Sequence, residues 1–175
     1  MTLVLGYIAY VYRGNLSVIG KFLMDDTGIS QIELGWLLSS FIWGYTIFQF
    51  PGGLISEKIG PKKTLALVTL GSSLITIITG LIVIGGFSLA LMIPLLFIFR
   101  FLLGVFQGPL FPATGGGVIA RWFPSGSWAF PNGLNSTALA LGSASTPPMI
   151  VLLTDQLKEQ SSVVWTPTLM RVLWS

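Results

Sequence analysis

The side chains in this chain that could do chemistry are few. There is no cysteine and no histidine, so disulfides, thiol chemistry and the usual zinc and haem ligand sets are excluded. The sequence offers no nucleophile with a base beside it and no cluster of acids, so we do not expect an enzyme, a metal site or a cofactor. The polar residues that remain inside apolar stretches are candidate ligand contacts. They are Arg13, Asn15, Tyr45, Gln49 and Gln107.

Arg13 is the most informative of these residues, because it lies in the middle of an apolar segment that contains no acid. A charged side chain at mid-membrane costs roughly 2.5–3.5 kcal/mol on insertion scales. A guanidinium is a planar fork of donors that matches carboxylate or phosphate. We therefore predict that Arg13 binds the anionic group of a ligand. The alternative is that it bonds backbone carbonyls or extends to the membrane interface.

The neutral candidates allow two interpretations. Tyr45 and Gln49 are four residues apart and so share one face of a helix. Together with Asn15 and Gln107 they can supply hydrogen bonds in a cavity, or they can join neighbouring helices. Arg100 is a second arginine in an apolar stretch without an acid.

Composition indicates that membrane helices must position these side chains. Only 9% of the residues are charged and 53% are hydrophobic, against about 25% charged in an ordinary soluble domain. An apolar stretch of about 20 residues matches the hydrocarbon layer of a bilayer. The net charge of +3 lies between the apolar runs and forms no basic face, so nucleic acid is not an expected partner.

We expect an all-α membrane protein with about five transmembrane helices in one bundle, residues 1–154. Ser30 and Glu33 have the spacing of a capping box that opens the second helix. Residues 155–175 are expected to form a non-cytoplasmic tail or an incomplete sixth span. The expected spans are 2–23, 31–52, 64–84, 89–119 and 133–153.

The charges between the spans predict an orientation. Lys58, Lys62, Lys63 and Arg121 fall in two alternate connections, whereas Asp25 and Asp26 fall in another. Lysine and arginine stay on the cytoplasmic side of a membrane. We therefore expect a multi-pass protein of the plasma membrane with a cytoplasmic N-terminus. Residues 52–63 would then form a charged, glycine-punctuated loop in the cytoplasm.

This loop also carries a family resemblance. The spacing of its glycine, acid and lysines resembles the loop 2–3 signature of the major facilitator superfamily, and Gly60-Pro61-Lys62-Lys63 looks like the organic anion symporter branch. Three more stretches agree, beginning at Arg13, Gly44 and Arg100. The signature residues, for which the resemblance implies a gating or structural role, are Gly53, Glu57, Lys58, Gly60, Lys62, Lys63, Arg100 and Gly104.

The resemblance implies the N-terminal half of a transporter built from two six-helix halves, so a C-terminal half is expected as a partner. It implies secondary transport of a small organic or phosphorylated anion by alternating access. Many relatives carry acids at the positions of Tyr12 and Gln107. Their absence leaves the co-transported ion open among a proton, sodium and a counter-anion.

Two alternatives remain at this stage. The chain could be a non-transporting membrane protein, truncated or acting as an assembly partner. It could also belong to a transporter of neutral solutes from the same superfamily.

Overall fold

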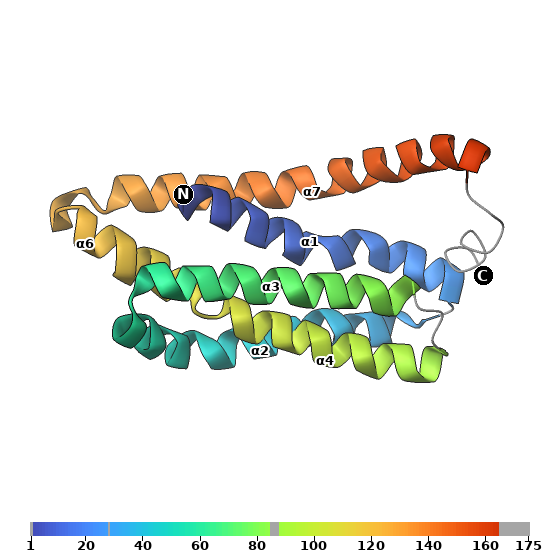
Figure 1. Ribbon diagram of the computed structural model, residues 1–175, viewed down its shortest axis with the longest axis horizontal. Coiled ribbons are helices and arrows are strands. Elements are labelled where there is room, and N and C mark those ends of the chain that lie inside the picture. Colours follow the sequence, from blue (N-terminus) through green and yellow to red (C-terminus); the bar gives the residue numbers. More distant parts are fainter. Residues whose placement is uncertain (1, 28, 85–87, 165–175) are drawn as a thin grey trace.

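The computed structural model describes residues 2–27, 29–84 and 88–164, and these residues are all-helical, as predicted (Figure 1). Segments α4 to α6 follow one another along one bent rod, so the described chain forms five long helical segments. The elements are α1 (Thr2–Thr27), α2 (Gln31–Ile59), α3 (Pro61–Ile84), α4 (Leu89–Gln107), α5 (Leu110–Pro112), the π-helix η1 (Ala113–Ile119), α6 (Ala120–Trp122), the 3-10 turn η2 (Ser125–Ser127) and α7 (Ala129–Val164).

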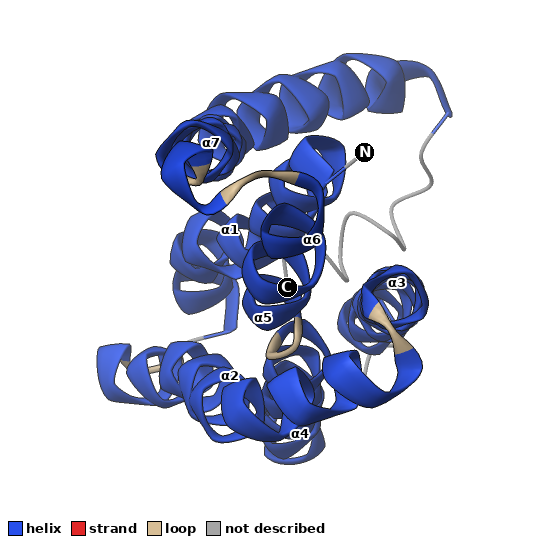
Figure 2. Cartoon of the chain, turned by 90° about the vertical axis from the view of Figure 1, so that its left-hand side faces the viewer, coloured by secondary structure: helices blue, strands red, loops and turns tan. Residues whose placement is uncertain are grey.

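The helices pack as two close pairs with α3 beside them. Helix α1 lies along α7, α2 lies along α4, and α3 packs against α4 and η1 (Figure 2). The start of α1, the α2–α3 connection and α6 lie at one end of the bundle. The end of α1, the start of α2, the end of α3 and the start of α4 lie at the opposite end (Figure 1). Successive helices therefore alternate in direction along the long axis.

Glycines set the close approach of α2 and α4. A Cβ added to Gly44 would overlap the carbonyl oxygen of Phe101, and one added to Gly104 would overlap the carbonyl oxygen of Phe41. Each helix thus presents bare backbone to the other. This arrangement maximises van der Waals contact, which drives helix association in lipid, where apolar burial gives no advantage.

The α1–α7 pair uses small residues together with a hydroxyl pair. A Cβ on Gly14 would lie 2.8 Å from the Thr146 methyl group, and one on Gly142 would lie 2.7 Å from the carbonyl oxygen of Tyr7. The hydroxyls of Tyr7 and Ser145 are 2.8 Å apart and hydrogen-bonded. The pair is therefore held by close backbone contact and a polar link across it.

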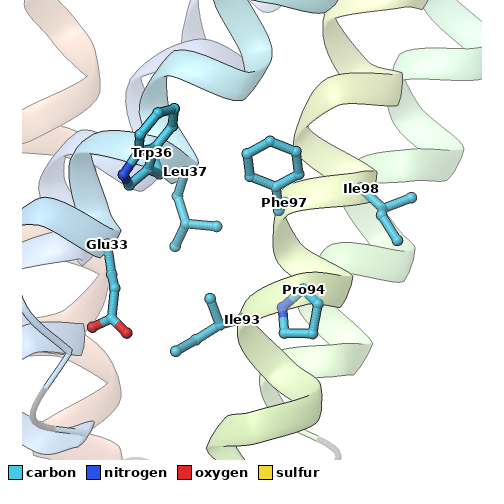
Figure 3. A pocket seen from close by; sticks show the side chains of 7 residues that line it. All are labelled: Glu33, Trp36, Leu37, Ile93, Pro94, Phe97 and Ile98. Atoms are coloured by element: carbon cyan, nitrogen blue, oxygen red, sulfur yellow. The ribbon is translucent and has the colours of Figure 1, made fainter.

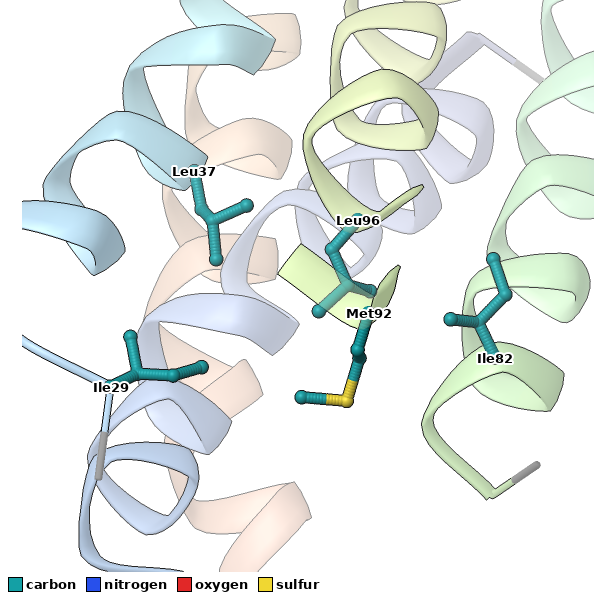
Figure 4. Packing of buried hydrophobic residues seen from close by; sticks show 5 residues of the cluster. All are labelled: Ile29, Leu37, Ile82, Met92 and Leu96. Carbon is teal, nitrogen blue, oxygen red and sulfur yellow. The ribbon is translucent and has the colours of Figure 1, made fainter. Parts of the chain in front are cut away.

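An apolar cluster joins α2, α3 and α4 near the start of α2, the end of α3 and the start of α4 (Figure 4). Leu37 and Leu96, each 1% exposed, meet across the α2–α4 gap, and Met92 and Ile82 extend the contact to α3. This cluster fixes the position of α3 relative to the α2–α4 pair.

The capping box at the start of α2 is confirmed. The Ser30 hydroxyl accepts from the Glu33 N–H at 3.2 Å, and the Glu33 carboxylate accepts from the Ser30 N–H at 2.9 Å.

The structure corrects the prediction of a loop over residues 52–63. Helix α2 continues through the charged residues to Ile59, and α3 begins at Pro61. Gly60 alone separates them, with φ of 88°, a conformation that side chains rarely adopt. Proline at the first position of α3 needs no hydrogen-bond donor, so the next helix starts at once. The stretch is a tight elbow, which we call the α2–α3 elbow, residues 56–63.

Within the described residues, two helical stretches are long and apolar enough to cross a membrane, Pro61–Val83 and Ala90–Trp122. The boundaries of the other predicted spans stay predictions. Helix α7 continues unbroken through Pro147 and Pro148 and on to Val164, so the first part of the predicted tail is helical. Residues 165–175 lie outside the described residues.

Candidate anion site on helix α1

Arg13 lies midway along α1 and is half-buried against three aromatic rings. Its guanidinium carbon is 4.6 Å from the ring centres of Phe41 and Tyr45 on α2, and 4.9 Å from that of Tyr10 on its own helix. A guanidinium over a ring face is stabilised by about 0.5–2 kcal/mol, depending on how far it is desolvated. The aromatic rings thus provide an environment for this cation that needs no acidic partner.

Phe41 and Tyr10 were not among the predicted site residues. Phe41 precedes Tyr45 by one helical turn, and the two rings stack with centres 6.0 Å apart and an angle of 17° between their planes. Tyr10 precedes Arg13 by three residues, so both lie on one face of α1. That spacing was visible in the sequence, but the meeting of α1 with the Phe41–Tyr45 face is a tertiary contact.

The other neutral candidates are placed differently. Tyr45 is half-buried beside Arg13, whereas Gln49, one turn further along α2, is exposed. Gln107 is 1% exposed, and its Nε2 donates to the carbonyl oxygen of Ala9 at a long 3.4 Å. The Asn15 side chain lies outside the described residues. The structure thus brings Tyr45 to Arg13 and uses Gln107 as a link between α1 and α4.

Tyr12 also joins two helices. Its hydroxyl is 3.1 Å from the Ser73 hydroxyl on α3, within hydrogen-bond distance. The face of α1 next to Arg13 is therefore tied to α3 by neutral hydroxyl groups.

Arg100 and Gly104 lie one turn apart on α4. Arg100 is 6% exposed, and Gly104 forms the backbone contact with Phe41 described above. Because Phe41 also contacts Arg13, this crossing fixes the position of one wall of the candidate site. What the Arg100 guanidinium binds stays a prediction.

The remaining signature residues gather at the α2–α3 elbow. Glu57, Lys58, Lys62 and Lys63 are exposed, while Ser56 is buried. Gly53 faces Pro112, which would lie 3.5 Å from an added Cβ. The charged groups are thus at the surface of the bundle end, and the small residues pack against the rod formed by α4 to α6. The gating role of these residues stays a prediction.

A separate cavity of about 370 Å³ opens between α2 and α4 (Figure 3). Apolar side chains line it except for Glu33, and the figure shows Leu37 and Phe97 facing each other across it. None of the predicted ligand contacts lines this cavity. It does not mark the candidate site.

Comparison with known proteins places the chain in a family. A probable galactarate/D-glucarate transporter of Bacillus subtilis is 40% identical over 118 residues, which are 67% of this chain and 25% of the relative. A probable sulfoacetate transporter of Cupriavidus necator is 32% identical over 147 residues, 84% of this chain and 32% of the relative.

A D-galactonate transporter of Escherichia coli is 31% identical over 150 residues, 86% of this chain and 33% of the relative. The chain thus spans between a quarter and a third of the length of these curated relatives. Residues 2–174 match the Major Facilitator Superfamily. The chain therefore belongs to this superfamily of multi-pass integral membrane transporters, which are not enzymes.

Proposed function

We propose that this chain is part of a secondary transporter that carries a small organic anion across the membrane by alternating access. The observation that carries the proposal is Arg13, a cation midway along a membrane helix that is stabilised by ring faces. A ring face stabilises a cation through its charge and takes up none of the in-plane N–H groups. Ring contacts therefore leave those N–H groups able to bind a ligand anion.

The chemistry of the relatives favours a carboxylate over a phosphate. Galactarate, D-glucarate, D-galactonate and sulfoacetate all carry at least one carboxylate group, and the first three also carry several hydroxyls. In the proposed complex Arg13 binds the carboxylate through two parallel hydrogen bonds. The Tyr45 hydroxyl and the exposed Gln49 on the same helix face supply partners for hydroxyl groups of the substrate.

The proposal includes the predicted location and partners. The protein lies in the plasma membrane with a cytoplasmic N-terminus, and the substrate path is completed by a C-terminal half. Tyr12 and Gln107 carry no carboxylate, so sodium coupling, exchange with a second anion and facilitated movement are alternatives to proton symport.

The test is uptake of radiolabelled D-galactonate, D-glucarate and sulfoacetate into proteoliposomes that contain the full-length protein. Arg13→Lys keeps the charge but loses the planar fork, so we expect kcat/KM to fall about tenfold or more. Arg13→Gln removes the charge, and we expect a fall of about 100-fold or more because a charge-assisted hydrogen-bond pair is lost.

Arg121→Gln is the matched control, because it removes an exposed guanidinium from the end of α6. We expect it to leave the KM unchanged. Wild-type uptake that survives Arg13→Gln with the same KM would contradict the assigned role of Arg13. Uptake of a neutral sugar in preference to all three anions would favour the neutral-solute alternative, and no uptake of any solute would favour a non-transporting protein.

A further inference from the structure

We propose that η1, the π-helical segment Ala113–Ile119, is a hinge about which α6 swings relative to α4. The purpose of such a hinge rests on the proposed transport cycle, since alternating access requires the ends of helices to move. Its physical basis lies in the backbone of the segment and in what surrounds it.

The backbone of η1 is wider and less regular than an α-helix. The N–H of Ala120 donates to the carbonyl of Gly115, five residues earlier, which extends the π-type bonding to the end of the segment. A run of seven π-helical residues is long for a type of helix that is mostly seen as a single turn. Pro109 and Pro112 just before it donate no hydrogen bonds, so the regular helix is already weakened there.

Side-chain hydrogen bonds partly compensate for this. The buried Thr114 hydroxyl lies 2.9 Å from the carbonyl oxygen of Leu110 and 3.1 Å from that of Phe111, so it donates to the turn below. The upstream end of η1 is thus anchored. The anchoring ends at the three consecutive glycines that follow, Gly115, Gly116 and Gly117.

Packing against the part of the chain that the structure describes does not explain the first two of these glycines. A Cβ added to Gly115 or Gly116 would meet no atom within 4 Å. By contrast, a Cβ on Gly108 would lie 2.8 Å from the backbone carbon of Phe48, so that glycine is required by the helix crossing.

Backbone conformation in this state does not explain them either. Among the described residues, Gly60 alone has a positive φ. Glycine lowers the stability of a helix relative to alanine, so two open glycines in succession are a cost without a benefit here. A second backbone conformation of the same segment would supply that benefit.

Gly117 has a different role at the downstream end. Its added Cβ would lie 2.6 Å from the Cβ of Pro61 in the α2–α3 elbow and 3.6 Å from the Ser56 hydroxyl oxygen. The contact is a bare backbone against a proline ring, a smooth apolar surface that can separate without breaking side-chain hydrogen bonds. The proposed motion therefore bends the rod at Gly115 and Gly116 and opens this contact between α6 and the elbow.

The test uses distances between pairs of spin labels in the full-length protein, measured without substrate. The described chain contains no cysteine of its own, so labels can be placed here without removing any. The pair Ile98→Cys with Trp122→Cys spans the hinge, and both native side chains are exposed. The pair Leu67→Cys with Trp122→Cys spans the elbow contact, and Leu67 is also exposed.

We expect two populations of distances for both pairs in the otherwise unchanged protein. Gly115→Ala with Gly116→Ala stiffens the segment without a steric clash, so we expect a single population that corresponds to the present structure. Gly117→Ala forces Pro61 away, so we expect the Leu67–Trp122 distance to shift to the longer population. Gly80→Ala in α3, where an added Cβ also meets nothing within 4 Å, is the matched control and should leave both distributions unchanged.

Three outcomes would overturn the hinge. The first is a single distance population in the unchanged protein. The second is that the double variant Gly115→Ala with Gly116→Ala has the same distance distribution as the unchanged protein. The third is a clear fall in the thermal midpoint of that double variant, because it would mean that these glycines make room for another part of the protein. The spin-label distances are measured without substrate. They would therefore remain valid even if no organic anion were taken up, so the hinge and the proposed transport function can fail independently.

Discussion

At the scale of single residues, Arg13 in α1 and Arg100 in α4 differ in their surroundings. Arg13 is half-buried against three rings, while Arg100 is 6% exposed inside α4. A cation that is stabilised by aromatic faces and partly accessible is suited to binding and releasing an anion. Arg100 is almost fully buried, so an anion would reach its guanidinium less easily. This difference is why the candidate site is centred on Arg13.

Gln107 gives a prediction at the same scale, because its hydrogen bond to Ala9 competes with its predicted role in ligand binding. Gln107→Leu removes the donor and keeps most of the side-chain volume. Hydrogen bonds between membrane helices are worth about 0.6 kcal/mol on average, so we expect a small fall in the thermal midpoint. We expect the KM for uptake to stay within about threefold of wild type, since about 0.6 kcal/mol corresponds to a factor of just under three.

Thermal unfolding in detergent and uptake kinetics check this prediction together. A KM raised tenfold with an unchanged midpoint would instead make Gln107 a substrate contact, as the sequence suggested. Gln107→Asn is a useful second variant, because it keeps the amide but shortens its reach toward Ala9.

At the scale of helices, the α2–α4 crossing helps to form the candidate anion site, because Phe41 takes part in the crossing and also contacts Arg13. Gly44→Ala places a methyl group on the carbonyl oxygen of Phe101, so the two helices must separate. Overpacking of this kind typically costs 1–3 kcal/mol, roughly, and a rigid backbone contact falls at the upper end. We expect a marked loss of folded protein and a lower thermal midpoint.

Gly35→Ala provides the matched control on the same helix, because an added Cβ there meets nothing within 4 Å. Size-exclusion chromatography and thermal unfolding compare the two variants. Equal yields and midpoints would show that the glycine contact between α2 and α4 does not determine the stability of the bundle.

At the scale of the whole molecule, the exposed lysines at positions 58, 62 and 63 and the exposed Arg121 lie at one end of the bundle, with the start of α1 (Figure 1). The α1–α2 connection, with Ser30, lies at the other end. Because anchoring cations favour the cytoplasmic side, we expect the lysine end to face the cytoplasm.

Single cysteines test this orientation in intact cells. We expect Lys63→Cys and Arg121→Cys to react with a membrane-impermeant maleimide only after the cells are opened. Ser30→Cys should react in intact cells, since Ser30 is exposed at the opposite end. Labelling of Lys63→Cys from outside would reverse the proposed topology.

The sequence by itself determined the class of fold, because 9% charge cannot cover a soluble surface and apolar runs of membrane length leave few alternatives. The capping box of Ser30 and Glu33 was also predictable, since both residues belong to one helical turn. The family was also predictable from the sequence, because its signature is a spacing of residues within short segments. Arg13 was identified as exceptional for a related reason, namely that no acid is near it along the chain.

Only the tertiary structure decided what surrounds these residues. The rings of Phe41 and Tyr45 reach Arg13 because α2 packs beside α1, and Gln107 reaches Ala9 although the two are 98 residues apart. The same applies to the glycines, which look alike in the sequence. Gly44 and Gly104 are required by backbone contact, while Gly115 and Gly116 face open space. The physical reason is that a pattern along one helix shows which residues share a face, but the neighbour of that face is set by how the helices pack.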